Sequence, residues 1–444
     1  MSTTFSALGL KTEIQKSLNA LKISVPTDIQ KKTIPVVLNE TNDVVALAKT
    51  GTGKTAAFGL PLLQLVDVSN TNIQTVILAP TRELGQQIHA NLESFATNLP
   101  DVKIAVVCGG VPIKPQIEVL KNTTHIVVAT PGRLADLVKR EVINIKNINH
   151  LILDEADEML SALKDGLDSI MPELPKSRRT LLFTATLPGA VKQLVQNYMN
   201  NKNIVHIEAN METVGHQGID HQYLVVEPIE KLEVLLHFLN TKEGQRGIIF
   251  CKTKAAVNKL AKNLAINKFS SSGLHGSLSQ GIRDRVMGQF REGNIDILVA
   301  TDLAARGIDV KEISYVVNYH LPDTFEAYVH RSGRTARAGA KGLSLTILQQ
   351  EEVQDIPEFE DELGVKFKTY KKASAESIEE NNTLLWAKKI FKTKPNHDIS
   401  NEFKTKVKTV FHHLTKDELI EKLLANHLSS KSLKLDTQSK KNIK

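Results

Sequence analysis

The chain has 444 residues, of which 41% are hydrophobic and 24% are charged, and its formal net charge is +7. These values are typical of a globular chain of two or three domains and exclude a low-complexity or membrane-spanning protein, because no apolar stretch is long enough to cross a bilayer. The two cysteines, Cys108 and Cys251, exclude a disulfide framework, and together with an amino terminus that lacks a secretory signal they predict a cytoplasmic protein.

The first 208 residues alternate short apolar runs with amphipathic stretches. Runs of Val, Ile and Leu of this length are typical of parallel strands that are buried on both faces. We therefore predict an α/β domain over residues 1–208, with strands at 43–47, 75–78, 104–107, 126–129, 151–153 and 180–183.

The strand predicted at 43–47 leads into the loop 48–55, which has the sequence AKTGTGKT. In such a loop, backbone N–H groups bind phosphate oxygens, Lys54 reaches the outer phosphates of a nucleoside triphosphate, and Thr55 offers a hydroxyl to Mg²⁺. Ala48 departs from the strict pattern, which begins with Gly. The predicted phosphate contacts are Thr50, Gly51, Thr52, Gly53, Lys54 and Thr55.

The strand predicted at 151–153 ends in Asp154 and Glu155. Acidic residues are common at helix starts, so this pair acquires meaning only beside the phosphate loop. There, Asp154 is a candidate partner of Mg²⁺, and Glu155 is a candidate to orient or deprotonate the attacking water. Together the two motifs predict hydrolysis of a nucleoside triphosphate.

A polar segment at 209–217 is predicted to be a linker, after which the same pattern begins again. The second domain, predicted over residues 218–365, has no phosphate loop of its own. Its strands are predicted at 223–226, 247–250, 297–300, 315–318 and 343–348.

Three arginines follow a predicted helix in the second domain: Arg331, Arg334 and Arg337. They would lie along one face if the segment coils, and a guanidinium suits the charge that develops on a transferred phosphoryl group. An arginine supplied across an interface contributes about 10³–10⁵ in hydrolysis rate. A second element, 301–309, follows a predicted strand at the sheet edge where ligands bind. We predict a two-lobed ATPase whose site is completed when the lobes close; a basic patch for solubility is the alternative for the arginines.

Residues 366–444 differ from the rest in charge. They hold 18 lysines, no arginine and nine acidic residues, whereas residues 1–365 carry 38 basic and 40 acidic residues. This excess favours an anionic partner such as nucleic acid; a solvated lysine-rich face is the alternative. Helical spacing from 399 to 414 and a capping box at Thr415 to Glu418 predict a small helical extension over 366–428, followed by a disordered tail at 429–444.

The order of these motifs closely resembles the DEAD-box family of ATP-dependent RNA helicases, in its bacterial form. The resemblance covers roughly residues 5–365 and is carried by the segments 23–30, 48–55, 80–84, 109–110, 130–133, 154–157, 184–186, 249–250, 280–283, 301–309 and 330–339.

The resemblance implies two tandem RecA-like domains that bind ATP with Mg²⁺ between them. It implies that Phe5, Ile23, Thr27 and Gln30 bind the adenine side of ATP, and that Gly307 and Asp309 contact the nucleotide from the second domain. His330, Arg334 and Arg337 fall on catalytic positions. Asp157, Thr184 and Thr186 fall on positions that couple hydrolysis to unwinding.

The resemblance also implies an RNA-dependent ATPase that locally unwinds or remodels short duplexes. The implied RNA contacts are Pro80, Thr81, Arg82, Gly110, Thr130, Arg133, Gly276, Arg283 and Thr301. These residue types suit the sugar-phosphate backbone rather than base edges, so we expect binding without sequence preference. Contacts to ribose 2′-OH groups would favour RNA over DNA.

Four positions depart from the family pattern. Lys22 and Ala336 stand where the family usually has Gly, Ile23 stands where it has an aromatic residue, and Thr184 stands where it has Ser. We expect Ala336 to be tolerated if its φ is negative.

Two alternative functions remain at this stage. The chain could be an ATP-gated RNA clamp that nucleates a complex, or a DNA helicase built on the same two-lobed plan. The extension has two interpretations as well: RNA anchoring through its lysines, or dimerisation through Leu384, Trp386, Phe391, Phe403 and Phe411. Protein partners cannot be named from the sequence.

Overall fold

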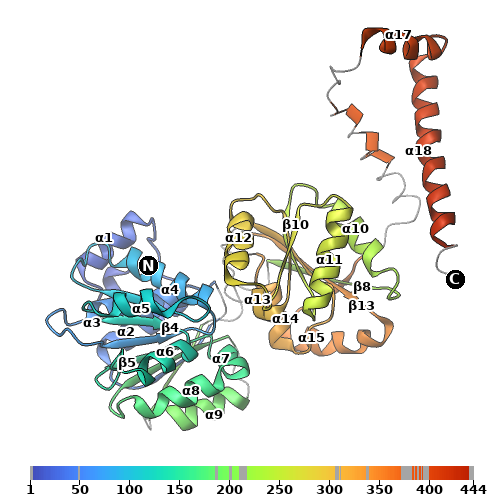
Figure 1. Ribbon diagram of the computed structural model, residues 1–444. Helices are drawn as coiled ribbons and strands as arrows, with labels where there is room; N and C mark the ends of the chain where they lie inside the picture. The colour runs from blue at the N-terminus through green and yellow to red at the C-terminus, as the bar shows by residue number, and fades with distance from the viewer. Residues whose placement is uncertain are drawn as a thin grey trace. The chain divides into compact units, whose positions relative to one another are not determined.

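The computed structural model describes residues 4–48, 51–185, 189–199, 203–209, 218–305, 310, 312–336, 340–371, 383–384, 386–387, 390–391, 393 and 400–439. Figure 1 shows two α/β parts, followed by a helical part at the carboxyl terminus. The chain divides into two compact units, residues 1–370 and residues 371–444. We call the α/β parts the first and second lobes; both belong to the unit 1–370.

The first lobe is built on a seven-stranded parallel sheet with the order β3-β4-β2-β5-β6-β1-β7. Its elements are η1 (Ser6–Leu8), α1 (Thr12–Ala20), α2 (Asp28–Asn39), β1 (Val44–Leu47), α3 (Lys54–Leu65), β2 (Thr75–Leu78), α4 (Arg82–Phe95), β3 (Ile104–Val107), α5 (Ile113–Leu120), β4 (Ile126–Ala129), α6 (Pro131–Lys139), β5 (His150–Asp154), α7 (Ala156–Ala162), α8 (Lys164–Ile170), η2 (Met171–Glu173), β6 (Arg179–Thr184), α9 (Gly189–Tyr198) and β7 (Val205–Glu208).

The second lobe repeats this plan with the strand order β10-β11-β9-β12-β13-β8-β14, again all parallel. Its elements are β8 (Ile219–Val225), α10 (Lys231–Asn240), β9 (Arg246–Phe250), α11 (Lys254–Ile266), β10 (Ser271–Leu274), α12 (Gln280–Arg291), β11 (Ile297–Ala300), α13 (Asp302–Ala305), β12 (Ile313–Asn318), α14 (Phe325–Ser332), β13 (Gly342–Leu348), η4 (Gln350–Asp355), α15 (Ile356–Leu363) and β14 (Lys368–Thr369).

Each sheet separates two hydrophobic clusters because side chains alternate along a strand. Val44 and Ala46 of β1 pack with α1 to α4 on one face, whereas Val45 packs with α6 to α9 on the other. In the second lobe, Ile249 and Ile248 divide in the same way between two clusters. The predicted fold class, two consecutive parallel-sheet domains with a helical extension, is confirmed.

Three strands were not predicted: β7, β10 and β14. β10 has the sequence Ser-Ser-Gly-Leu and β14 has only two residues, so neither contains an apolar run. β14 pairs with β8, which places it in the second sheet although it lies beyond the predicted boundary at residue 365. Most of the predicted linker, 210–217, lies outside the described residues.

The extension contains α17 (Asn401–Val410) and α18 (Lys416–Ser439). The predicted capping box begins α18: the Thr415 backbone N–H donates to the Glu418 carboxylate, and the Glu418 N–H donates to the Thr415 hydroxyl. α18 continues to Ser439, into the segment 429–444 for which disorder is predicted, and that prediction stays a prediction. That stretch contains no Gly or Pro to end the helix. None of the described helices is both long and apolar enough to span a bilayer.

Lys22 closes α1 in a left-handed conformation with φ of 59°. The Ile23 N–H donates to the Leu18 carbonyl and the Lys22 N–H to the Asn19 carbonyl, which is the Schellman arrangement that favours glycine at this position. Lys22 therefore stands at a position where the backbone conformation favours glycine.

We expect Lys22→Gly to raise the free energy of unfolding of the first lobe by about 0.5 kcal/mol, because removing left-handed strain outweighs the added freedom of the unfolded chain. Calorimetry of the full chain measures it. Lys31→Gly, inside α2, is the matched control and should destabilise the lobe by about 1 kcal/mol. Equal destabilisation by both variants would contradict the strain argument.

Candidate functional site

The carboxyl ends of three neighbouring strands bring together the motifs predicted to bind nucleotide. β1 leads into the phosphate loop, β5 ends at Asp154, and β6 lies between them in the sheet and ends at Thr184. The Ala48 N–H donates to the Thr184 carbonyl over 3.0 Å, so the start of the loop is tied to the end of β6. Thr184 is fully buried at the predicted coupling position.

Lys54 and Asp154 are both buried at the centre of this edge. The Lys54 Nζ lies 3.9 Å from the Asp154 Oδ1 and has no hydrogen-bond partner, although the Lys54 side chain is only 7% exposed. Burial raises the pKa of Asp154 to about 6, although Lys54 acts in the opposite direction. An amine and a carboxylate this deeply buried need more partners than they have, and phosphate oxygens with a metal ion would supply them.

The phosphate loop depends on two glycines with left-handed backbones, Gly51 with φ of 80° and Gly53 with φ of 89°. A Cβ on Gly53 would lie 2.3 Å from the Gln30 Nε2, so this position has no room for a side chain. Gly53 is also the N-cap of α3, whose first residues are Lys54 and Thr55. Thr52 and Thr55 are partly buried, and Thr50 lies outside the described residues.

Gln30 joins the predicted adenine segment to the phosphate loop. Its Nε2 donates to the Gly53 carbonyl over 3.1 Å, and its Oε1 accepts from the Thr27 N–H over 2.9 Å in the capping box of α2. Phe5 is buried in the first hydrophobic cluster, and Ile23 packs against the same cluster. The four predicted adenine contacts are thus held by the core and the loop together.

Glu155 occupies the turn between β5 and α7 with φ of 52°, a conformation that non-glycine residues seldom adopt. Its N–H donates to the Asp154 Oδ1 over 3.0 Å, and its side chain is mostly buried. Strain of this kind is retained where the surrounding structure over-determines a residue, and it accumulates at functional sites.

His330 of the second lobe contacts the acidic segment of the first. Its Nδ1 lies 2.5 Å from the Glu158 Oε1, and its Nε2 lies 3.8 Å from the Asp157 Oδ2. Burial alone would lower the pKa of His330, but the hydrogen bond that the ring donates to Glu158 and the charges of Asp157, Glu158 and Glu155 raise it. Glu158 was not predicted; its only sequence signal is its position directly after the predicted coupling residue Asp157.

Two of the three predicted arginines, Arg331 and Arg334, lie among the described residues. Arg331 is buried and forms a two-point ion pair with Asp302, at 2.5 Å and 2.7 Å, and it also donates to the Asn318 side chain and the His320 carbonyl. Arg331 also lines the same small pocket as Arg334, as expected for positions three residues apart, so the arginine face stays a prediction. Asp302, its partner, was not predicted.

Arg334 lies next to His330, to whose carbonyl its Nε donates over 3.1 Å. It lines a small pocket together with Glu158, Asp302 and His330. Arg337, Gly307, Asp309 and Thr186 lie outside the described residues.

Ala336 has φ of 55°, so the condition under which we expected it to be tolerated, a negative φ, is not met. The Ala336 backbone therefore adopts a conformation that glycine accepts without strain, whereas alanine carries a methyl group that makes it strained. The departure at Ala336 thus carries the same kind of cost as the departure at Lys22.

The predicted RNA contacts of the first lobe follow the other strands of its sheet. Pro80, Thr81 and Arg82 follow β2, Gly110 follows β3, and Thr130 and Arg133 follow β4. The Gly109 N–H donates to the Thr130 hydroxyl over 3.0 Å, and Arg133 donates to the Val111 carbonyl, which ties two of the motifs together. Thr81 caps α4 by accepting from the Leu84 N–H. In the second lobe, Gly276 is exposed and Thr301 is partly buried.

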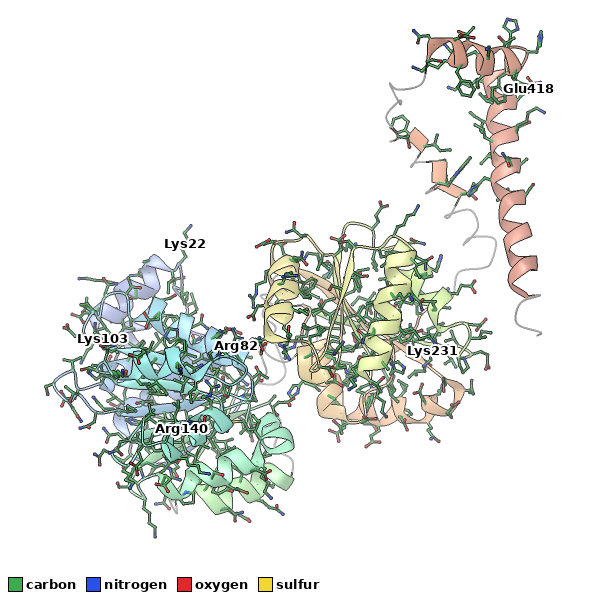
Figure 2. All side chains as sticks on the ribbon, in the orientation of Figure 1. Lys22, Arg82, Lys103, Arg140, Lys231 and Glu418 are labelled. Atoms are coloured by element: carbon green, nitrogen blue, oxygen red, sulfur yellow. The ribbon has the colours of Figure 1, made fainter. Side chains whose placement is uncertain are left out.

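Two of the predicted RNA-binding arginines are paired with acids of the opposite lobe. Arg82 lies 3.2 Å from Asp284 on α12, and Arg283 of α12 lies 3.1 Å from Glu83 on α4. We call these four residues the cross-lobe ion pairs; Figure 2 labels Arg82. Glu83 and Asp284 were not predicted, and the signal was two Arg-acid dipeptides, each at the start of a helix.

Comparison with family models gives three matches along the chain. Residues 27–194 match the DEAD/DEAH box helicase model, and residues 230–339 match the helicase conserved C-terminal domain. Residues 378–431 match the model described as the helical domain of a probable ATP-dependent RNA helicase.

Curated relatives and solved structures agree with these matches. CshA from Geobacillus kaustophilus, a DEAD-box ATP-dependent RNA helicase, is 38% identical over 81% of this chain and 76% of its own length. CshA from Limosilactobacillus reuteri is 40% identical over 84% of this chain and 74% of its own length. S. cerevisiae Dbp5 bound to RNA and ADP BeF3 aligns with a TM-score of 0.77 and 29% identity over 86% of this chain and 100% of that chain. Mss116p bound to ssRNA and AMP-PNP aligns with a TM-score of 0.75 and 29% identity, over 86% of this chain and 82% of that chain.

We expect Glu158→Gln to lower the pKa of His330, because the substitution removes a charge and weakens the hydrogen bond that raises it. A histidine whose pKa is raised by folding stabilises the folded chain. This stabilisation is present in full below pH 6.5, the usual histidine pKa, and is lost as the pH rises through the raised pKa of the folded chain. Histidine NMR titration and thermal unfolding between pH 6 and pH 8 measure both effects, and Glu173→Gln, at an exposed acid of the same lobe, is the control. A His330 pKa that stays unchanged would show that Glu158 is not its partner in solution.

Proposed function

This chain belongs to the DEAD-box family of ATP-dependent RNA helicases, and from that premise we propose that it hydrolyses ATP between its two lobes and uses the cycle to open short RNA duplexes. The proposal rests on the observation that the nucleotide motifs of the first lobe and His330 of the second lobe come together. The phosphate loop and the acids share one sheet edge, and the second lobe brings His330 against the residues that follow those acids.

In the proposed reaction, the loop N–H groups and Lys54 bind the phosphates of ATP. Glu155, held in its strained turn, orients the attacking water and accepts its proton. Arg334 and Arg337 of the second lobe stabilise the charge that develops on the transferred phosphoryl group, so hydrolysis requires closure of the lobes.

The residues present fit a magnesium ion that accompanies ATP. Among the described residues no group of three or more His, Cys, Asp or Glu side chains could hold a metal by itself. Mg²⁺ usually binds through one or two protein oxygens together with phosphate oxygens and water, which suits the Thr55 hydroxyl and Asp154. The ion would neutralise phosphate charge during transfer.

RNA is proposed to bind along the carboxyl ends of β2, β3 and β4 and the corresponding loops of the second lobe. The predicted contacts there are small, hydroxyl-bearing or arginine side chains, which bind phosphates without reading bases. Opening five base pairs costs about 7 kcal/mol at roughly 1.4 kcal/mol per step, so one ATP cycle suits local opening of short duplexes.

Two other activities are distinguishable by simple measurements. An ATP-gated RNA clamp would bind both ligands without multiple turnovers. A DNA helicase would show ATPase stimulation by DNA equal to that by RNA. We favour the RNA-dependent ATPase because Glu155 and Arg334 are both present and both buried at the site.

We propose that the extension anchors RNA. It forms a unit separate from the lobes, it carries the excess positive charge of the chain, and it matches a helical domain of RNA helicases. Its exposed apolar side chains, among them Phe391 at 91% and Val410 at 74%, favour dimerisation as the second candidate. We propose that the two lobes comprise residues 1–208 and 218–370, so that the second lobe ends after β14 rather than at residue 365.

We also propose a cytoplasmic location. Cys108 and Cys251 are both free and buried, and burial raises the pKa of the Cys108 thiol to about 11 and that of Cys251 to about 12, which suits unreactive core thiols.

We expect Glu155→Gln to abolish RNA-stimulated ATP hydrolysis, with a fall of at least about 10²-fold in kcat, because the amide cannot accept a proton. The binding of a nonhydrolysable ATP analogue and of RNA should be retained. A coupled ATPase assay and fluorescence anisotropy measure the two properties. Hydrolysis at the wild-type rate would remove Glu155 from the mechanism, and loss of ATP binding would show that the substitution damages the fold.

We expect a chain that ends after Tyr370 to need about tenfold more RNA for half-maximal ATPase activity, with a larger difference at higher salt. The ATPase rate at saturating RNA should be unchanged, since the truncation leaves both sheets complete. Light scattering on the same samples measures the oligomeric state. Conversion of a dimer to a monomer without change in the RNA requirement would support the dimerisation role instead.

A further inference from the structure

The helix α14 carries His330 and leads to Arg334, so its position decides where both side chains lie. Two residues before His330, the Tyr328 side chain is fully buried. Its hydroxyl lies 2.6 Å from the His221 Nδ1 on β8 and 3.2 Å from the Ser344 hydroxyl on β13. These hydrogen bonds attach α14 to two adjacent strands of the second sheet.

The ring of Tyr328 is also enclosed by aromatic side chains. Its centroid lies 5.5 Å from that of Phe359 on α15 and 5.4 Å from that of Phe367. Phe367 stacks on His221 as well, with centroids 5.3 Å apart and the rings 25° from parallel. Figure 1 shows α14 and α15 near β8 and β13 in the second lobe. Offset aromatic pairs at these distances are stabilising and directional.

Phe367 belongs to a short stretch, residues 366–370, that we call the β14 segment. Two backbone N–H groups of this segment are fixed: that of Phe367 donates to the Glu360 carboxylate over 2.7 Å, and that of Tyr370 donates to the Tyr223 carbonyl over 2.7 Å. The Lys368 side chain also forms an ion pair with Asp220 at 2.6 Å. Residue 371, directly after it, begins the unit that contains the extension.

We propose that the β14 segment positions α14 for ATP hydrolysis, with Phe367 acting through Tyr328 on the helix that carries His330 and Arg334. Phe367 is then a positioning residue, and the junction with the extension is part of the catalytic apparatus. The inference rests on the proposed function, because it assumes that His330 and Arg334 act in hydrolysis.

The attachment is permanent rather than pH-dependent. Burial lowers the pKa of His221 to about 4, against a smaller opposing effect of Asp220, so the ring is neutral at physiological pH. Its hydrogen bond with Tyr328 therefore persists across the range in which the enzyme works.

The proposal predicts which kinetic constant changes. The phosphate loop and the Gln30 segment belong to the first lobe, and the predicted nucleotide contacts of the second lobe, Gly307 and Asp309, do not lie on α14. We therefore expect ground-state binding of ATP not to depend on the β14 segment. A displaced α14 would withdraw groups that act on the transition state, which lowers kcat and leaves KM for ATP unchanged.

The test compares Phe367→Ala with Leu260→Ala in the full chain. Leu260 lies on α11, is buried in a different hydrophobic cluster of the same lobe and serves as the matched control. Both variants should lower the Tm. Only Phe367→Ala should lower the kcat of RNA-stimulated ATPase, by about tenfold, because misplacing a catalytic group by a fraction of an ångström is costly. Equal kcat values in the two variants would overturn the proposal.

A second variant and a second measurement cover the case in which Phe367→Ala does not fold. Tyr328→Phe removes one hydroxyl and keeps the ring, and it should lower kcat without changing KM for ATP. Amide hydrogen exchange of residues 325–332 should quicken in both variants, relative to exchange in α11. Unchanged exchange and unchanged kcat in Tyr328→Phe would refute the coupling. A wild-type chain without RNA-stimulated ATPase would instead refute the proposed function, and the exchange experiment would still test the mechanical link.

Discussion

A buried amine without a hydrogen-bond partner is the constraint on which this site depends. Lys54 lies 3.9 Å from Asp154, too far for a hydrogen bond, and both groups are removed from water. The effective cost of burying an ion is several kcal/mol, and only well-placed partners repay it. The raised pKa of Asp154 reflects the same deficit. Bound Mg²⁺ and triphosphate would satisfy both groups at once.

The carboxyl edge of the first sheet is divided between two sets of predicted contacts. β5, β6 and β1 present the nucleotide motifs, and β3, β4 and β2 present the predicted RNA contacts. The two halves meet where β2 pairs with β5, in the register Leu78 to Leu153. Arg82 follows the first of these strands and Asp154 ends the second. A parallel sheet thereby places phosphate chemistry and RNA binding a single strand apart.

The second lobe contacts the first lobe through side chains of two helices, α14 and α12. α14 brings His330 to Glu158, and α12 supplies Arg283 and Asp284 to the cross-lobe ion pairs. The surface ion pair Arg82–Asp284 contributes little to stability by itself. The contacts of His330 and Arg283 are more buried and are therefore less screened by solvent. Arg82 and Arg283, which form the cross-lobe ion pairs, are also predicted RNA contacts.

The local features of this protein were determined by sequence alone: alternating apolar runs specified the strands, and the glycine-rich loop with its acidic partner specified the nucleotide site. Such features need only neighbouring residues, because strand burial and phosphate binding follow from short-range periodicity and backbone geometry. Only the tertiary structure decided that β10 is a strand despite its Ser-Ser-Gly-Leu sequence, that Arg331 is buried on Asp302, and that Ala336 has a positive φ. It also decided that the second lobe meets Glu158 and Glu83 of the first lobe, and that Asp284 of the second lobe meets Arg82. Their partners lie far away along the chain, and no helical or strand period encodes which distant charge a side chain will face.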